Sequence, residues 1–287
     1  MRNILSVDVE DWFHILDIAA EPPVATWGDL ESRVERNFHV LMDVFERHGQ
    51  RVTCFFLGWI AERFPNLVRE ALTRGHEIAS HGSHHQLVYG QTPERFRADI
   101  RDAKSLLEDI AGTRVEGYRA PGFSVVPATP WALEEIAAAG YTYDSSIFPA
   151  SRGHGGFVGA PLHPHRIKTP GGDLLEFPVS VASVLGRRIC FFGGGYLRLF
   201  PWPLIARMAR QVAADGRPVV YYLHPREIDP RQPRLPMPAV RRIKSYVNLS
   251  TTAGKLERLL EGGGLTTFRD WIAADGQRMS PTAWPAA

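Results

Sequence analysis

Three histidines crowd into one short segment, His81, His84 and His85, in the pentad H-G-S-H-H. Imidazole nitrogens are common ligands of zinc and other divalent metals. Residues four positions apart share a face where the backbone turns helically, so the spacing favours His81 and His85 as a ligand pair. With this pair as ligands, His84 would lie behind them or on the surface. A carboxylate added to the pair would complete an open metal site of the catalytic kind, whereas the alternative is a surface histidine cluster.

Three acids, Asp8, Glu10 and Asp11, end a short apolar run near the N-terminus. Acids also favour helix N-termini, so these residues could simply cap a following helix. Their position at the end of a buried strand, in a chain that also carries the histidine pentad, favours a chemical role. Taken together, the two clusters predict a metal-dependent hydrolase.

Further polar residues follow other predicted strands. Arg119, in Y-R-A-P-G, could hold a carboxylate bidentately and keep it ionised, or be an ordinary surface arginine. His224, in Y-Y-L-H-P, could be structural, but a site with acids and a metal still needs a proton donor. Asp144, in Y-D-S-S, is equally well explained by turn chemistry. Residues 191–198 combine aromatics with a glycine run and predict either a flexible loop or a wall on which sugars stack.

The elements that must position these residues alternate between strands and helices. Apolar periodicity and Gly or Pro boundaries predict helices over 30–48, 66–74, 93–111, 130–139, 201–214 and 251–261. Strands are expected over 4–9, 52–57, 77–80, 117–120, 141–144 and 218–223, with further strands at 181–189 and 265–268 and a long loop carrying a hairpin over 154–178.

This alternation predicts an α/β fold with a parallel sheet, and at 287 residues a barrel is favoured over an open doubly wound sheet. No G-x-G-x-x-G follows the first strand, which argues against a dinucleotide site. In a barrel the functional residues lie just past the carboxyl ends of the strands. All the candidate residues fall at such ends.

Bulk composition narrows the function further. A formal net charge of +2 provides no basic surface of the size that nucleic acid binding needs. The two cysteines, Cys54 and Cys190, lie in apolar surroundings and are expected to be buried free thiols. No apolar stretch approaches a membrane span and the N-terminus lacks an apolar signal region, so we expect a soluble, cytoplasmic protein.

Five ordered motifs resemble the polysaccharide deacetylases, the NodB-homology or carbohydrate esterase family 4 fold. They are S-V-D-V-E-D-W-F-H, G-H-E-I-A-S-H-G-S-H-H, Y-R-A-P-G-F-S, Y-D-S-S-I-F-P and Y-L-H-P-R-E-I-D-P. The similarity is closest to the subgroup found beside exopolysaccharide and exosortase (PEP-CTERM) loci. It implies a distorted (β/α) barrel over residues 1–230, with residues 231–287 as a C-terminal extension packed on the same compact domain.

The resemblance also implies roles for single residues. Asp8 matches the catalytic base, His81 and His85 the metal histidines, Arg119 the arginine that tethers the base, and His224 the general acid. The implied cofactor is a divalent metal, most commonly Zn²⁺, with Co²⁺, Ni²⁺ or Mn²⁺ as alternatives. The expected substrate contacts are Pro121, Tyr196 and Leu223, the last of these lining the acetyl pocket.

The chain departs from the family pattern at three positions. Typical members have adjacent aspartates, whereas here the order is Asp-Val-Glu-Asp, so that Glu10 is the expected third ligand and Asp11 the alternative. Gly82 replaces the usual Ser or Thr after the first histidine. Asp144 only loosely matches the acid that supports the catalytic histidine.

The expected activity is removal of acetyl groups from N-acetylated sugars of an exopolysaccharide or its lipid-linked precursor, possible partners being the synthesis and export machinery. One alternative is a cyclic-amide or allantoin-type hydrolase on the same barrel, which a closed pocket would favour. An open groove lined by aromatics such as Tyr196 and Trp202 would favour a glycan. Another alternative is a non-catalytic glycan-binding component of the export machinery. Neither the sugar nor the oligomeric state follows from the sequence.

Overall fold

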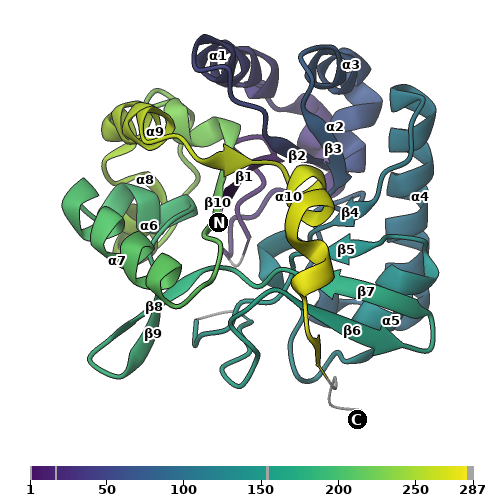
Figure 1. Ribbon diagram of the computed structural model, residues 1–287. Helices are drawn as coiled ribbons and strands as arrows, with labels where there is room; N and C mark the ends of the chain where they lie inside the picture. Colours follow the sequence, from purple (N-terminus) through teal and green to yellow (C-terminus); the bar gives the residue numbers. More distant parts are fainter. Residues whose placement is uncertain (1, 17, 153–154, 283–287) are drawn as a thin grey trace.

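The computed structural model describes residues 2–16, 18–152 and 155–282. A curved, mostly parallel sheet forms its centre, and helices cover the outer face of the sheet (Figure 1). The strand order is β10-β1-β2-β3-β4-β5-β7-β6-β12, with β11 paired to β1, and every ladder in it is parallel except that between β6 and β7. The predicted α/β fold, a distorted (β/α) barrel, is confirmed. Among the described residues no ladder joins β10 to β12, so backbone pairing does not close the barrel.

Eight strands lie within or close to the ranges in which the sequence predicts strands. They are β1 (Asn3–Val9), β2 (Thr53–Phe56), β3 (Glu77–Ser80), β4 (Gly117–Tyr118), β5 (Tyr143–Asp144), β6 (His165–Thr169), β7 (Gly172–Glu176) and β10 (Val220–Leu223). The hairpin expected in the long loop is formed by β6 and β7; residues 153 and 154, where that loop begins, lie outside the described residues. The single strand expected over 181–189 is wrong, because the chain turns at Leu185 and Gly186 and forms the hairpin β8 (Val181–Val184) and β9 (Arg187–Cys190).

Six helices occupy the predicted ranges with small shifts at their ends. They are α1 (Val34–Arg47), α3 (Pro65–Thr73), α4 (Pro93–Ala111), α5 (Trp131–Ala138), α7 (Trp202–Ala214) and α9 (Thr252–Glu261). The sequence pattern missed four shorter helices: α2 (Gly58–Arg63), α6 (Gly194–Leu199), α8 (Ala239–Tyr246) and α10 (Phe268–Asp275). The chain also ends in two short strands, β11 (Leu265–Thr266) and β12 (Pro281–Thr282). In Figure 1, α6 to α9 gather on the side of the sheet opposite α4 and α5.

Side chains alternate between the two faces of each strand and pack in two separate hydrophobic cores. Leu5 and Val7 of β1 point outward and pack in the large cluster that includes the covering helices. Ile4 of the same strand points inward and packs with Phe55 and with Phe268 of α10 in the barrel interior. Parallel strands covered on both faces are apolar on both faces. A polar residue that points inward at the carboxyl end of such a strand is therefore an exception that marks the site.

Both cysteines are buried free thiols, as expected. Burial raises the pKa of the Cys54 thiol, which keeps it protonated and unreactive. No helix in the described part of the chain has the length and apolar character to cross a bilayer.

Candidate active site

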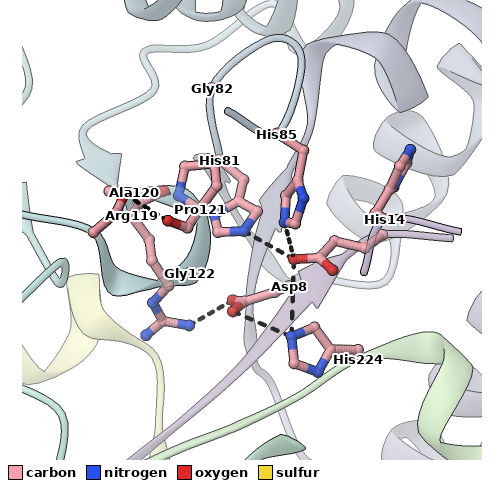
Figure 2. Close-up of polar contacts among 12 residues, drawn as sticks. Asp8, His14, His81, Gly82, His85, Arg119, Ala120, Pro121, Gly122 and His224 are labelled. Atoms are coloured by element: carbon pink, nitrogen blue, oxygen red, sulfur yellow. Dashed lines mark hydrogen bonds and ion pairs between the residues drawn. The ribbon is translucent and has the colours of Figure 1, made fainter. Parts of the chain in front are cut away.

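The carboxyl ends of β1, β3, β4 and β10 bring the chemically active side chains to one place (Figure 2). Asp8 and Glu10 come from β1 and the residue after it, and His81, Arg119 and His224 directly follow β3, β4 and β10. Asp8, Glu10, His81 and Arg119 are almost fully buried, whereas 17% of the His224 side chain is exposed. These residues therefore meet at the carboxyl ends of the strands, where the sequence analysis expected them.

Two imidazoles converge on one carboxylate oxygen. Nε2 of His81 lies 3.0 Å and Nε2 of His85 lies 2.9 Å from Oε1 of Glu10. Nδ1 of His81 donates to the Arg119 carbonyl at 2.7 Å, which leaves Nε2 with a free electron pair toward Glu10. Burial alone would raise the pKa of Glu10, but the neighbouring His85, His224 and His81 outweigh it and hold that pKa well below its usual value. Two imidazole nitrogens and one ionised oxygen that meet in this way fit a divalent metal.

The pentad that provides these imidazoles is not helical, contrary to the expectation from its spacing. Its backbone turns through positive φ values at Gly82 (75°) and His85 (53°), and this loop, rather than a helix face, aligns the two rings. A left-handed histidine is strained, and such strain concentrates at functional sites. His84 points away from Glu10, with half of its side chain exposed and Nδ1 3.7 Å from Oδ1 of Asp99.

Gly82 lies in surroundings that leave little room for a side chain. A Cβ there would lie 2.8 Å from Oδ2 of Asp99, the same atom that accepts from the Ser83 N–H at 3.0 Å. The Gly82 N–H donates instead to Oγ of Ser80. Asp99 and Ser80 therefore hold this turn through the backbone N–H groups of Ser83 and Gly82.

Gly82→Ser is expected to lower the free energy of unfolding by at least about 1–2 kcal/mol, the cost of left-handed backbone for an L-residue. Gly112→Ser is a matched control, because Gly112 has a φ of 65° with no atom within 4 Å of an added Cβ. Urea unfolding of both variants separates the backbone cost from the contact with Asp99. Equal losses in the two variants would contradict a tight fit at position 82.

Asp11 lies apart from the histidines, and its two carboxylate oxygens are engaged at the start of α1. They accept from the backbone N–H groups of Trp12, Arg33 and Val34 and from Oγ of Ser32 at 2.6 Å. This is the capping role that acids commonly take. It explains why α1 begins at Val34 rather than at Leu30. The geometry brings Glu10, and not the alternative Asp11, to the two imidazoles.

Asp8 is held by Arg119, which is completely buried. Nη1 of Arg119 lies 2.5 Å from Oδ1 of Asp8 and 2.9 Å from Oγ of Ser6, and Nη2 donates to Oγ of Ser145 at 3.2 Å. The bidentate contact expected from the sequence is therefore wrong, because a single nitrogen meets the carboxylate (Figure 2). The guanidinium plane lies over Phe55, 4.1 Å from the ring centroid, which fixes its orientation.

Glu227, which the sequence analysis missed, supports His224. Its Oε2 lies 3.3 Å from Nδ1 of His224 and accepts from the His224 backbone N–H at 3.1 Å. The other oxygen contacts Nη1 of the buried Arg198. Nε2 of His224 lies 3.8 Å from both Asp8 and Glu10. Burial opposes charge on the ring, but Glu10, Glu227 and Asp8 outweigh it and raise the pKa of His224 to about 9.

Asp144 does not take the supporting role that Glu227 has. Its oxygens accept from Oγ of Ser146 at 2.5 Å and from the Ser146 backbone at 3.1 Å, and Oγ of Ser146 accepts from the Ala120 N–H. Asp144 thus holds the loop that follows Arg119. Burial raises the pKa of Asp144, and burial together with repulsion by Asp144 raises that of Glu176 well above its usual value. The two carboxyl groups retain a proton as a result.

Glu176→Gln is expected to flatten the pH dependence of stability. Carboxyl pKa values that are higher in the folded than in the unfolded chain stabilise the fold most at low pH, and this contribution is lost as pH rises through the folded values. Glutamine at 176 cannot ionise and still accepts from the Ile147 N–H, which now bonds to Oε1. The measurement is the free energy of unfolding at pH 5 and pH 8, with the exposed Glu134→Gln as control. A slope equal to that of the unaltered protein would contradict the shared proton.

A cleft of about 270 Å³ opens over these residues. Tyr196, an expected substrate contact, lines it, and so do Gly122, Phe123 and Tyr222. Leu223 does not, because alternation along β10 points Tyr222 and His224 inward and buries Leu223 among the outer core residues. Leu223 therefore does not face the cleft, contrary to the expectation that it lines an acetyl pocket. Pro121 and Trp202 are also absent from the lining.

Two family models match this chain. Residues 24–143 match the polysaccharide deacetylase family, and residues 145–273 match a domain of unknown function, DUF3473. The first match shows that residues 24–143 are similar to the polysaccharide deacetylase family. The candidate site draws on both segments: His81, His85 and Arg119 lie in the first, and His224 and Glu227 in the second.

Curated relatives resemble only part of the chain. A peptidoglycan-N-acetylglucosamine deacetylase from Bacillus cereus is 29% identical over 96 residues, which is 33% of this chain and 35% of the relative. A peptidoglycan deacetylase from Helicobacter pylori is 25% identical over 107 residues, 37% of this chain and 36% of the relative. The matches therefore span about a third of the length of these relatives.

Solved structures share the fold over nearly the whole chain. A candidate polysaccharide deacetylase from Mycobacterium smegmatis superposes with a TM-score of 0.62 at 19% identity, over 100% of this chain and 96% of that one. Puue allantoinase superposes with a TM-score of 0.61 at 16% identity, over 94% and 90% of the two chains. At such low identity these similarities establish the barrel fold alone.

Proposed function

We propose that this protein is a metal-dependent hydrolase that removes acetyl groups from N-acetylated sugars of a polysaccharide. The observation that carries the proposal is the convergence of His81 and His85 on Glu10, with Nε2 of His224 3.8 Å from both Glu10 and Asp8. The family match over residues 24–143 and the names of the curated relatives support the same chemistry.

Glu10, His81 and His85 are the residues that would hold the metal. Three protein ligands leave coordination positions for water and substrate, as in catalytic sites. A bound divalent ion would lower the pKa of a water molecule and polarise the acetyl carbonyl. The metal is expected to be Zn²⁺, because imidazole and carboxylate suit it, with Co²⁺, Ni²⁺ or Mn²⁺ as alternatives.

The remaining residues move protons and orient one another. Asp8, which is fixed by Arg119, accepts the proton of the attacking water. His224, whose Nδ1 contacts the Glu227 carboxylate, donates a proton to the departing sugar amine. Glu227 and Arg198 keep the ring in place through Nδ1, so that Nε2 faces the cleft. The products are acetate and a free amino sugar.

An exopolysaccharide or its lipid-linked precursor is the substrate that we propose. The cleft is bordered by Tyr196 and by Leu199, which is 51% exposed, so that it opens to solvent beside the site. An open, aromatic-lined cleft accommodates a glycan better than a small cyclic amide. This favours the deacetylase over the allantoin-type alternative, although both kinds of enzyme use the same barrel.

The test is acetate release from N-acetylated oligosaccharides, with allantoin and related cyclic amides as competing substrates. We expect acetate from the oligosaccharides, loss of activity after chelation and recovery on addition of Zn²⁺. Activity that survives complete metal removal would contradict the mechanism, and turnover of the cyclic amide alone would replace the proposed substrate class. Binding of the oligosaccharides without turnover would favour a glycan-binding component instead.

A further inference from the structure

One wall of the cleft is strongly basic. Arg226, which follows His224, and Arg241 and Lys244 of α8 all line the cleft, and we call these three residues the basic wall. The acids that line the same cleft are Asp8 and Glu10, both of which belong to the catalytic group. Positive charge therefore predominates in the cleft lining outside the catalytic group.

The basic wall belongs to a segment of uniform charge. Residues 230–256 contain six Lys or Arg residues and no Asp or Glu, in a chain whose net charge is only +2. Two arginines outside α8 hold this helix through its backbone carbonyl groups. Nη2 of Arg198 donates to the Lys244 carbonyl at 2.9 Å, and Nη2 of Arg226 reaches the Ser245 carbonyl at 3.5 Å.

No carboxylate neutralises the basic wall among the described residues, where none lies within 4.0 Å of a side-chain nitrogen of Arg226, Arg241 or Lys244. Arg226 donates to the Gln232 side chain and Arg241 to the Leu16 carbonyl, which are both uncharged acceptors. Nε of Arg241 is buried without a partner. The nearby carboxylate of Glu227 already contacts Arg198 and His224.

Unneutralised cations held close together repel one another, and a bound anion relieves that repulsion. Arginine forks match the oxygens of carboxylates and phosphates, and a lysine adds a mobile point charge. Burial and repulsion by Arg198 lower the pKa of Arg226 to about 10, so Arg226 remains charged at neutral pH. The basic wall thus offers positive charge and nitrogen donors to an anionic group.

We infer that the substrate is an anionic glycan, whose carboxylate or phosphate binds the basic wall while the acetylated sugar lies at His224 and Glu10. This inference rests on the proposed deacetylase function and specifies its substrate. The shared chemistry is an oxyanion next to the acetylated sugar. Its source is either a neighbouring uronic acid of the polymer or a phosphate that links the sugar to a carrier.

The experiment compares three N-acetylglucosamine substrates: a neutral oligosaccharide, the same oligosaccharide with an adjacent uronic acid, and a glycosyl phosphate. We expect kcat/KM to be about tenfold or more higher for at least one anionic substrate, since a hydrogen bond to a charged group contributes roughly 1.5–3 kcal/mol. The preference should lie mainly in KM and shrink as salt concentration rises. The better of the two anionic substrates identifies the source of the oxyanion.

Two double variants test the wall itself. Arg241→Gln with Lys244→Gln should reduce the anionic-to-neutral ratio of kcat/KM about tenfold. Arg231→Gln with Arg242→Gln is the matched control, because it removes the same charge from exposed positions outside the cleft lining and should leave the ratio unchanged. An equal ratio for all substrates in the unaltered protein, or an equal fall in both variants, would overturn the inference.

Binding separates this inference from the proposed function. Calorimetric titration of Asp8→Asn with the anionic and neutral oligosaccharides measures the preference without turnover. Tighter binding of the anionic ligand, lost in the Arg241 and Lys244 variant, supports the basic wall even if no substrate releases acetate. Acetate release without any anionic preference would support the deacetylase and reject the basic wall.

Discussion

Asp8→Asn is expected to reduce kcat for acetate release by about 10²–10⁴-fold, the usual contribution of a general base. Asparagine keeps an oxygen for Nη1 of Arg119 but cannot accept the proton of a water molecule. Metal affinity should change little, because Glu10 and the two histidines, rather than Asp8, form the proposed ligand set. The measurement pairs steady-state acetate release with calorimetric titration of Zn²⁺.

The free energy of unfolding of Asp8→Asn must also be measured. Arg119 is completely buried, so removing the charge of its partner should also lower the free energy of unfolding by about 3–5 kcal/mol. Ser6→Ala is the control, since Oγ of Ser6 also accepts from Nη1 of Arg119 and its loss disturbs the arginine without removing the carboxylate. A kcat for Asp8→Asn within tenfold of that for Ser6→Ala would reject Asp8 as the base.

His81→Ala is expected to weaken metal binding by about 100-fold or more, because even residues behind a metal ligand contribute 10–100-fold to affinity. Deacetylase activity at limiting metal should fall with it. The reason is geometric: Nε2 of His81 lies 3.0 Å from Oε1 of Glu10, and Nδ1 is fixed by the Arg119 carbonyl. Zn²⁺ titration in a chelator buffer gives the dissociation constant.

The same pentad offers the matched control. His84→Ala removes an imidazole three residues away whose side chain is half exposed and faces Asp99, so metal affinity and activity should stay within about threefold of the unaltered protein. Thermal unfolding of both variants without metal checks that the turn survives. Similar losses of affinity in the two variants would mean that the pentad acts as a loose cluster and not through a defined ligand pair.

Much of the barrel was predictable because local sequence patterns indicate its strands and long helices. The apolar run that became β1 and the helical spacing that became α1 and α4 are strong signals over a few turns. The short helices α6 and α8 were missed for the opposite reason. A glycine run opens α6, and α8 is stabilised by the carbonyl contacts of Arg198 and Arg226, which come from distant parts of the chain.

Some residues of the candidate site were likewise predictable from local sequence, and others were not. Asp8, His81, Arg119 and His224 were found because each lies near the carboxyl end of a predicted strand, and these ends meet at one edge of a barrel. Glu227 was missed because nothing in P-R-E-I-D-P marks it locally. Its role depends on a turn, Pro225–Ile228, that returns its side chain to His224 three residues earlier. The expected role of Leu223 failed because a one-residue step along a strand reverses the direction of the side chain.

The sequence by itself determined which chemical groups this protein has and in what order they reach the strand ends, because strand periodicity and residue type are local properties. It predicted that the H-G-S-H-H pentad and the acids form one site. Only the tertiary structure shows which acid lies beside the histidines. The carboxylate of Asp11 accepts hydrogen bonds at the N-terminus of α1, whereas Glu10 contacts the histidines. Pairing and burial depend on contacts between distant segments, and no local pattern contains them.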